Sequence, residues 1–186
     1  MKINEILKNT SSSYLDENLE IESIAYDSRK VSKDSLFIAI KGLNFDGHDY
    51  INEAINKGAL AIIANGKSPD KCVVPIIKVK NTRKALSRLS ANFYNHPSKK
   101  INTIAVTGTN GKTTTCFLIN QIFNNNNLNT GSIGTLGFIS SLDIINTGFT
   151  TPESLELHGF LDNLVRGGVE HVIMEASSHA LAQHRM

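Results

Sequence analysis

The sequence has few of the residues from which disulfide frameworks and membrane spans are built. Its 186 residues include two cysteines, four prolines and no tryptophan. Cys72 and Cys116 show no metal-site spacing and no paired framework, so each is expected to be a buried free thiol in a reducing compartment. The apolar run at residues 59–64 is far too short to cross a bilayer, and the N-terminus lacks a signal-peptide core. These absences predict a cytoplasmic protein without a membrane partner.

Charge of one sign is also scarce. Nineteen lysines and arginines oppose seventeen aspartates and glutamates, a formal charge of +2, and 40% of the residues are hydrophobic, as in ordinary globular proteins. The densest basic group lies on or beside a predicted helix and has no interleaved aromatic residues: Lys78, Lys80, Arg83, Lys84 and Arg88. Such a group is typical of a solvated helix face, so no nucleic-acid partner is expected.

Strand and helix signals alternate along the chain, which predicts an α/β fold with mostly parallel sheets. Strands are predicted at residues 19–26, 36–40, 59–64, 73–79, 101–106 and 169–174. Pro75 favours an edge position for its strand. Helices are predicted at residues 3–7, 49–57 and 116–123 and after Thr82 and Thr151, with Asp49, Thr82 and Thr151 as capping residues and glycines or asparagines at several ends.

The best candidate for a domain boundary is the polar stretch at residues 95–100, which contains the turn-forming Pro97. It divides the chain into an N-terminal α/β domain, residues 1–98, and the first part of a second α/β domain, residues 99–186. The second domain begins with the strand at residues 101–106. That strand leads directly into the most informative stretch of the chain.

Residues 107–115 read Thr-Gly-Thr-Asn-Gly-Lys-Thr-Thr-Thr and lie between a β-branched run and a helix. Gly108 and Gly111 let the backbone turn with its N–H groups pointing inward, where they can bind phosphate oxygens. Lys112 supplies a charge for the outer phosphates of a nucleotide, and the Thr113 hydroxyl can join a Mg²⁺ shell. The stretch therefore predicts a phosphate-binding loop.

The match to the pattern G-x-x-x-x-G-K-[ST] is incomplete, because Val106 stands at the first glycine position. A tight turn before an ordinary helix is the alternative. Glu175 ends a predicted strand at the edge of the sheet where ligands bind in open α/β folds, although it could also face solvent or cap a turn. Ser177 and His179 do not by themselves indicate a hydrolytic triad, since sequence neighbours do not define its geometry.

The local form Gly-Thr-Asn-Gly-Lys-Thr-Thr resembles the ATP loop of the Mur ligases, which add amino acids to the cell-wall precursor. Further segments resemble this family in order along the chain: residues 27–29, 36–42, 46–51, 150–153, 174–181 and 183–185. The first three are similar to the N-terminal domain shared by the third and fourth ligases of the pathway. The last three are similar to the third type, the tripeptide synthetases.

The resemblance implies a UDP-binding N-terminal domain followed by part of a P-loop, Rossmann-like ATP-binding domain. It implies ATP and Mg²⁺ as cofactors, with UDP-N-acetylmuramoyl-L-alanyl-D-glutamate and either meso-diaminopimelate or L-lysine as substrates. Lys112 and Glu175 are the implied catalytic residues, and Thr113 and Glu175 the implied metal contacts. ATP contacts are implied at Gly108, Thr109, Asn110, Gly111, Lys112, Thr113 and Thr114. Precursor contacts are implied at Tyr26, Ser28, Leu43, Asn44, Phe45, Thr150, Thr151, Ser177, Gln183 and Arg185.

Several alternatives stay open. Phe149 departs from the family's substrate loop, which puts that contact in doubt. Ser28 could simply cap a turn after a strand, where Asp27 and Arg29 could pair. Mur ligases are much longer than this chain, so the chain alone could be a non-catalytic module that holds the UDP precursor or ATP. It is expected to be a monomer. A P-loop ligase of the folylpolyglutamate type or the fourth Mur type is a further alternative.

Overall fold

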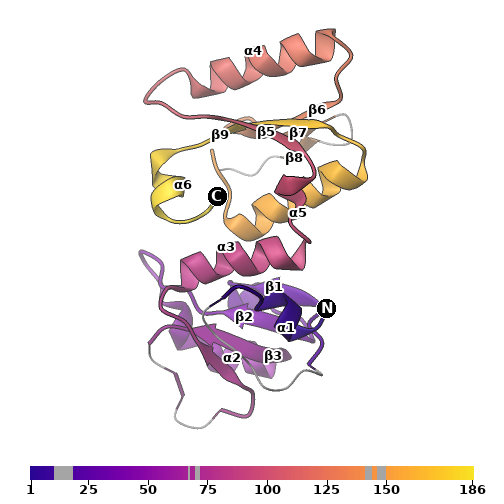
Figure 1. The fold of residues 1–186 in the computed structure, drawn as a ribbon. Coiled ribbons are helices and arrows are strands. Elements are labelled where there is room, and N and C mark those ends of the chain that lie inside the picture. The colour runs from indigo at the N-terminus through magenta and orange to yellow at the C-terminus, as the bar shows by residue number, and fades with distance from the viewer. Residues whose placement is uncertain (11–18, 67, 70–71, 141–143, 146–149) are drawn as a thin grey trace. The chain divides into compact units, whose positions relative to one another are not determined.

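The computed structural model describes residues 1–10, 19–66, 68–69, 72–140, 144–145 and 150–186 (Figure 1). Residues 11–18, and Phe149 of the expected substrate loop, lie outside these described residues. The chain forms two units, Met1–Phe93 and Tyr94–Met186. In the described part of the chain, no helix is long and apolar enough to cross a membrane.

The first unit is built on a parallel sheet with the strand order β1-β2-β3-β4. Its strands are β1 (Ser23–Ala25), β2 (Ser35–Ile38), β3 (Ala59–Ala64) and β4 (Ile76–Lys78). The edge position of β4 confirms the expectation from Pro75. The strand predicted at residues 19–26 is shorter than expected, because Glu20 pairs with Lys2 and the Ile21 N–H donates to the Met1 carbonyl instead of joining β2.

Helices cover both faces of this sheet, with α2 (Ile51–Asn56) on one side and α3 (Thr82–Phe93) on the other (Figure 1). Phe37 and Ile62 share a buried cluster with Ile51 of α2. The alternate residues of β2, which strand geometry directs to the opposite face, are also fully buried. The short helix α1 (Ile3–Ile6) packs beside α3, where the Asn92 side chain donates to the Ile6 carbonyl at 2.7 Å. Both faces are therefore buried, as is usual for parallel sheets.

Two of the predicted helix caps in this unit are wrong. Asp46, not Asp49, accepts a backbone N–H and opens the 3₁₀ turn η2 (Gly47–Tyr50) that precedes α2. At α3 the Asn81 side chain accepts the Lys84 N–H at 2.9 Å, and Thr82 lies inside the helix. In both cases a polar side chain slightly earlier in the chain accepts the hydrogen bond from the free N–H instead.

The second unit has a five-stranded sheet with the order β5-β9-β6-β7-β8. β5 (Asn102–Val106), β9 (His171–Glu175) and β6 (Thr130–Gly134) are parallel, whereas β7 (Gly137–Ser140) and β8 (Ile144–Ile145) extend the sheet in antiparallel fashion. β6 and β7 thus form a hairpin. A mostly parallel α/β fold is confirmed.

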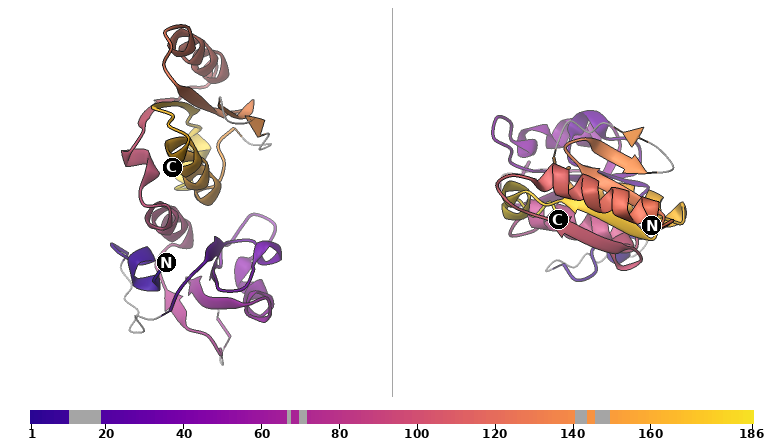
Figure 2. Two further views of the ribbon diagram at one scale, coloured as in Figure 1. Left: turned by 90° about the vertical axis from the view of Figure 1, so that its right-hand side faces the viewer. Right: turned by 90° about the horizontal axis from the view of Figure 1, so that it is seen from above.

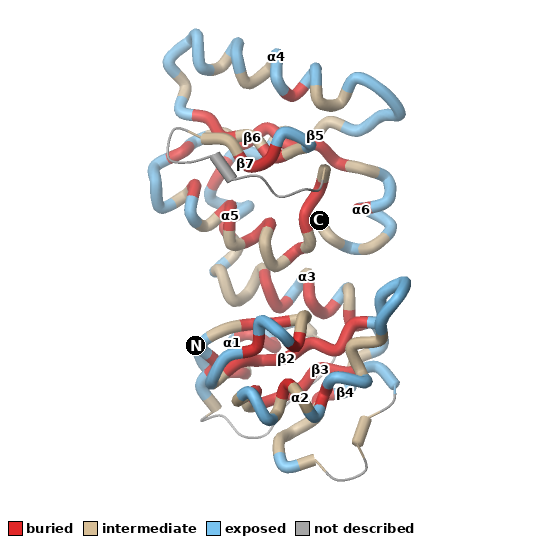
Figure 3. Tube along the Cα trace, turned by 180° about the vertical axis from the view of Figure 1, so that it is seen from behind, coloured by how far each residue is buried: buried red, intermediate tan, exposed pale blue. Residues whose placement is uncertain are grey.

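Two long helices lie on opposite faces of this sheet, α4 (Lys112–Asn125) and α5 (Ser154–Arg166) (Figures 1 and 2). The main core is on the α5 face, where Leu157, Leu161 and Leu164 pack against Ile133 and Val172. The described residues of α4 bury only Cys116, and the outer side of this helix is largely exposed (Figure 3). Cys72 is only half-buried, so the expectation of two buried thiols holds for Cys116 alone; both thiols are free.

The stability of the second unit depends on pH through His158. Its ring is buried in α5, and no described residue gives its Nδ1 atom a hydrogen bond. Burial, with a smaller contribution from His96, lowers the pKa of His158 from 6.5 to about 4. The unfolded chain therefore binds a proton that the folded unit excludes between these pH values. The stability contribution is complete above pH 6.5 and falls as the pH drops toward 4.

We predict that His158→Gln weakens this acid sensitivity. Between pH 7 and about pH 4.5, protonation of His158 in the unfolded state should cost the wild-type unit about 2 kcal/mol. Urea unfolding followed by circular dichroism at both pH values measures the loss. The variant should lose less stability than the wild type over the same interval, and an identical loss in both proteins would contradict the role given to His158.

Candidate functional site

The candidate site lies where the parallel strands of the second unit end. Val106 at the end of β5 is paired with Glu175 at the end of β9, and Ile133 near the end of β6 is paired with Met174. The carboxyl ends of three neighbouring strands therefore meet at one edge, where open α/β sheets bind ligands. Glu175 ends its strand there as predicted.

The loop after β5 has the backbone that its glycines predict. Gly108 has a φ of 152° and Gly111 a φ of 80°, both in a region that residues with a Cβ rarely adopt. The helix α4 begins directly after Gly111. The Lys112 side chain turns back over the loop and donates to the Gly108 carbonyl at 2.8 Å and to the Thr109 carbonyl at 3.4 Å. Lys112 thus holds a positive charge above the loop.

The Glu175 carboxylate is the most buried charged group of the site, with 2% of the residue exposed. Its Oε1 atom accepts the Thr113 hydroxyl at 2.9 Å and the Thr135 backbone N–H at 2.8 Å. Its Oε2 atom accepts the Thr135 hydroxyl at 3.3 Å. These donors come from α4 and from the β6–β7 turn, so the carboxylate joins both elements to β9.

Gly134 and Thr135 belong to this site although the sequence did not single them out. A Cβ atom on Gly134 would clash with Oε1 of Glu175 and lie 2.9 Å from its Cγ and Cδ atoms. The glycine therefore makes room for the carboxylate. The signal available in the sequence was a glycine within a strand segment, which often marks a close approach of other groups to the backbone.

A cavity of about 290 Å³ opens in front of these groups. Its lining carries one cationic and one anionic side chain and is otherwise made of hydroxyl, amide and backbone groups: Thr109, Asn110, Gly111, Lys112, Thr113, Thr114, Thr135, Thr150 and Glu175. The described residues contain no group of three or more metal-ligating His, Cys, Asp or Glu side chains. One carboxylate beside a hydroxyl fits Mg²⁺, which takes few protein ligands and completes its shell with phosphate oxygens and water.

The two threonines that precede α5 differ in their contacts. The Thr150 hydroxyl lies 3.1 Å from the Thr135 hydroxyl and lines the cavity. The Thr151 hydroxyl donates to the Glu175 carbonyl at 3.0 Å and accepts the Ser177 N–H at 3.4 Å. The prediction that Thr151 caps α5 is therefore wrong: the helix begins at Ser154, and the Thr151 side chain is engaged with β9.

Three residues expected to contact a precursor lie near the end of the chain. Ser177 caps the short helix α6 (Ser178–Ala182) by accepting the Ala180 N–H. Arg185 donates to the Gln183 side chain at 2.7 Å and to the Thr151 carbonyl at 3.2 Å. Its guanidinium also pairs with Glu153 at 3.1 Å. The structure thus gathers Thr151, Gln183 and Arg185 into one polar network.

The other expected precursor residues lie in the first unit. Ser28 is buried in the 3₁₀ turn η1 (Ser28–Lys30), which follows β1 and Tyr26. The predicted pairing of Asp27 with Arg29 is confirmed at 2.7 Å, and this hydrogen bond lowers the pKa of Asp27. The loop at residues 43–45 presents Leu43 and Phe45 to solvent, 95% and 72% exposed, on either side of Asn44.

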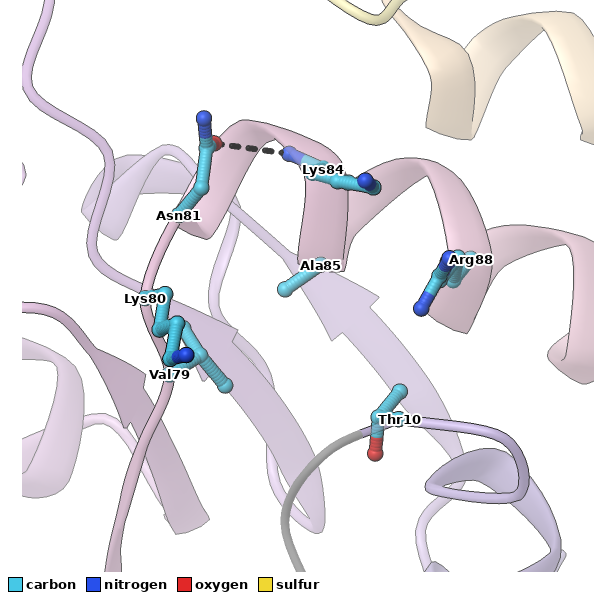
Figure 4. A pocket seen from close by; sticks show the side chains of 7 residues that line it. All are labelled: Thr10, Val79, Lys80, Asn81, Lys84, Ala85 and Arg88. Carbon is cyan, nitrogen blue, oxygen red and sulfur yellow. Dashed lines mark hydrogen bonds between the residues drawn. The ribbon is translucent and has the colours of Figure 1, made fainter.

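A second pocket, of about 150 Å³, lies on the first unit beside the start of α3 (Figure 4). Lys80, Lys84 and Arg88 give it positive charge, while Thr10, Val79, Asn81 and Ala85 complete its lining. Arg88 donates to the Asn9 carbonyl at 3.2 Å. None of these described lining residues is aromatic, so the pocket offers no surface on which bases could stack.

Comparison with known proteins matches both units to one family. Residues 20–94 match the model described as "Mur ligase family, catalytic domain", and residues 106–186 match "Mur ligase middle domain". The UDP-N-acetylmuramoyl-L-alanyl-D-glutamate–2,6-diaminopimelate ligase of Clostridioides difficile is 46% identical over 169 residues, which cover 91% of this chain and 35% of that protein.

Solved structures agree with this match. A UDP-N-acetylmuramoyl-L-alanyl-D-glutamate–2,6-diaminopimelate ligase superimposes with a TM-score of 0.80 at 25% identity, covering 100% of this chain and 37% of the other. A MurF ligase from Thermotoga maritima, in complex with ADP, gives a TM-score of 0.57 at 25% identity, over 87% of this chain and 33% of the other. The chain thus spans about a third of the length of these relatives.

We predict that Gly134→Ala destabilises the second unit through its clash with Glu175. The added methyl group should cost about 1–3 kcal/mol, as overpacking does in other proteins. Urea unfolding of four proteins measures this coupling: the wild type, Gly134→Ala, Glu175→Ala and the double variant. Glu175→Ala removes the atoms in the way, so the alanine at position 134 should cost less in that background. Equal costs in both backgrounds would show that the two residues do not interact.

Proposed function

The chain belongs to the Mur ligase family, and from this membership and the geometry of its site we propose that it supplies the nucleotide site of an ATP-dependent amide-bond ligase. The observation that carries the proposal is the convergence of Lys112, Thr113 and Glu175 on one cavity beside the phosphate loop. The ADP complex of the Thermotoga maritima relative supports a nucleotide in this kind of site.

The acceptor substrate of the proposed reaction is UDP-N-acetylmuramoyl-L-alanyl-D-glutamate in peptidoglycan synthesis. The names of the relatives support this substrate and favour 2,6-diaminopimelate over L-lysine as the residue added. The higher TM-score of the tripeptide-forming ligase, 0.80 against 0.57 for the MurF ligase, favours the third ligase type over the fourth. We place this activity in the cytoplasm and expect a monomer.

The chemistry follows from the poor reactivity of a carboxylate toward amines. The D-glutamate carboxylate attacks the γ-phosphorus of ATP, ADP leaves, and the acyl phosphate formed has a good leaving group. The amine of the incoming residue then displaces phosphate and forms the amide. Lys112 and the loop N–H groups stabilise the negative charge that gathers on the transferred phosphoryl group. Thr113 and Glu175 would hold Mg²⁺, which would supply further positive charge at the phosphates.

The hydrogen bonds at the start of α5 support different roles for the two threonines of the proposed precursor site. The hydroxyl proton of Thr151 is already given to the Glu175 carbonyl, so this side chain has no second proton to donate. Thr150 lines the cavity and is the better donor to an anionic substrate. Arg185 is held by Gln183 and Glu153, which fixes the plane of its guanidinium for a bidentate contact.

The first unit is proposed to bind the UDP end of the precursor. Ser28, on the turn after β1, and the exposed loop at residues 43–45 are proposed to contact the UDP end, with Tyr26 beside them. Because the chain covers about a third of its relatives, turnover is assigned to the complete ligase. The 186 residues by themselves are proposed to bind nucleotide and precursor without turnover.

We predict that Lys112→Ala weakens nucleotide binding by the 186-residue chain. A charge-assisted hydrogen bond is worth about 1.5–3 kcal/mol, so the affinity should fall roughly tenfold to a hundredfold. Calorimetric titration with a non-hydrolysable ATP analogue and Mg²⁺ measures the change. Lys100→Ala removes an exposed lysine of the same unit and should leave the affinity unchanged. Equal affinities of the wild type and Lys112→Ala would contradict the assignment of this loop to phosphate binding.

We also predict that the chain binds UDP-N-acetylmuramoyl-L-alanyl-D-glutamate and that Arg185→Lys weakens this binding about tenfold, because lysine cannot replace a planar bidentate donor. Arg166→Lys is the matched control, since Arg166 pairs with Asp162 on the surface of α5. Titrations with the UDP precursor and with a folate test the substrate class. Preference for the folate would support the folylpolyglutamate type instead.

A further inference from the structure

Thr135 lies at the tip of the β6–β7 hairpin, outside the phosphate loop and outside the precursor residues discussed above. We propose that Thr135 is a positioning residue that orients the Glu175 carboxylate so that its Oε2 atom faces Mg²⁺. The proposal rests on the assignment of this cavity to a Mg²⁺-nucleotide. It concerns which oxygen of Glu175 is used and which side chain determines that choice.

The hydrogen bonds to Glu175 are unequal on its two oxygens. Oε1 accepts two short bonds, from the Thr113 hydroxyl at 2.9 Å and from the Thr135 N–H at 2.8 Å. Among the described residues, Oε2 accepts one longer bond, from the Thr135 hydroxyl at 3.3 Å. Oε1 is therefore the anchored atom. Oε2 keeps more of its lone-pair capacity and is the atom that a cation can engage at least cost.

The direction of the hydroxyl bonds follows from the protons available. The Thr135 hydroxyl lies near both Glu175 Oε2 and the Thr150 hydroxyl, at 3.3 Å and 3.1 Å. The Thr135 hydroxyl is the donor in both contacts and has a single proton, so Glu175 Oε2 and the Thr150 hydroxyl share it. The Thr135 hydroxyl, together with the N–H of the same residue, holds both carboxylate oxygens and fixes the rotation of the carboxylate. It also joins the nucleotide cavity to the segment before α5.

The backbone and the side chain of Thr135 have separable tasks. Its N–H holds Oε1 whatever the side chain is, and Gly134 leaves the space in which the carboxylate sits. The hydroxyl alone reaches Oε2. Thr135 is itself exposed, so removing the hydroxyl leaves no cavity in a core. Groups that orient a metal ligand in this way typically change metal affinity by about 10–100-fold when they are lost.

The test compares Thr135→Val, which keeps the backbone N–H and the shape but lacks the hydroxyl, with Thr135→Ser, which keeps the hydroxyl. The 186-residue chain is titrated with a non-hydrolysable ATP analogue, once with Mg²⁺ and once with a chelator. Thr135→Val should lose about tenfold in affinity with Mg²⁺ and nothing without it, and Thr135→Ser should stay within about twofold of the wild type. Thr103→Val, at an exposed position of β5, is the matched control and should change neither affinity.

Other outcomes separate this inference from the proposed function. If Thr135→Val binds the Mg²⁺-nucleotide as well as the wild type does, the positioning role is overturned while the nucleotide site stands. If it loses the same factor with and without Mg²⁺, Thr135 is structural and the inference fails. If the wild type binds no nucleotide under either condition, the proposed function fails and this inference fails with it. Thr135→Ala also lacks the hydroxyl but has a smaller side chain, so it should show the same Mg²⁺-dependent loss as Thr135→Val. A loss seen with valine alone would come from strain in the turn and would overturn the inference.

Discussion

The structure of the second unit depends on the hydrogen bonds that the buried carboxylate of Glu175 accepts. Burying the Glu175 side chain among β5, β9 and β6 would be costly without hydrogen bonds, because an unpaired charge loses its hydration there. Thr113 and Thr135 provide those bonds from α4 and from the β6–β7 turn. The same contacts hold the first turn of α4, and with it the phosphate loop, against the ends of two other strands. The group proposed for catalysis is therefore also a tie between three elements.

The local parts of the fold were predictable from sequence. β3 and the edge position of β4 follow from short apolar runs and from Pro75, and the phosphate loop follows from Gly108 and Gly111, whose φ values are those a side chain would oppose. These features depend on residues close together in the chain. The roles that the resemblance implies for Lys112 and Glu175 stay predictions, although the structure brings both residues to one cavity.

The parts that were missed depend on contacts between distant residues. Thr135 and Glu175 are 40 residues apart, and nothing in the stretch around Gly134 shows that a carboxylate will occupy the space beside it. The capping errors have a related cause. Thr151 has the hydroxyl of a good helix cap, but its proton goes to the carbonyl of Glu175 on another element. A short polar side chain can serve several partners, and tertiary structure decides between them.

The charges of the cavity explain why a divalent cation belongs to the proposed chemistry. Lys112 and Glu175 are its only charged side chains among the described lining residues, so their charges cancel. Lys112 is bonded to carbonyls, and no described carboxylate lies within ion-pair distance of it, so its charge is available to an anion. Glu175, however, would repel the phosphates of a nucleotide. A cation between Glu175 and the phosphates turns that repulsion into attraction on both sides, while the loop N–H groups and the positive end of α4 act on the remaining oxygens. The buried carboxylate that ties the unit together therefore favours a polyphosphate ligand that brings a metal ion with it.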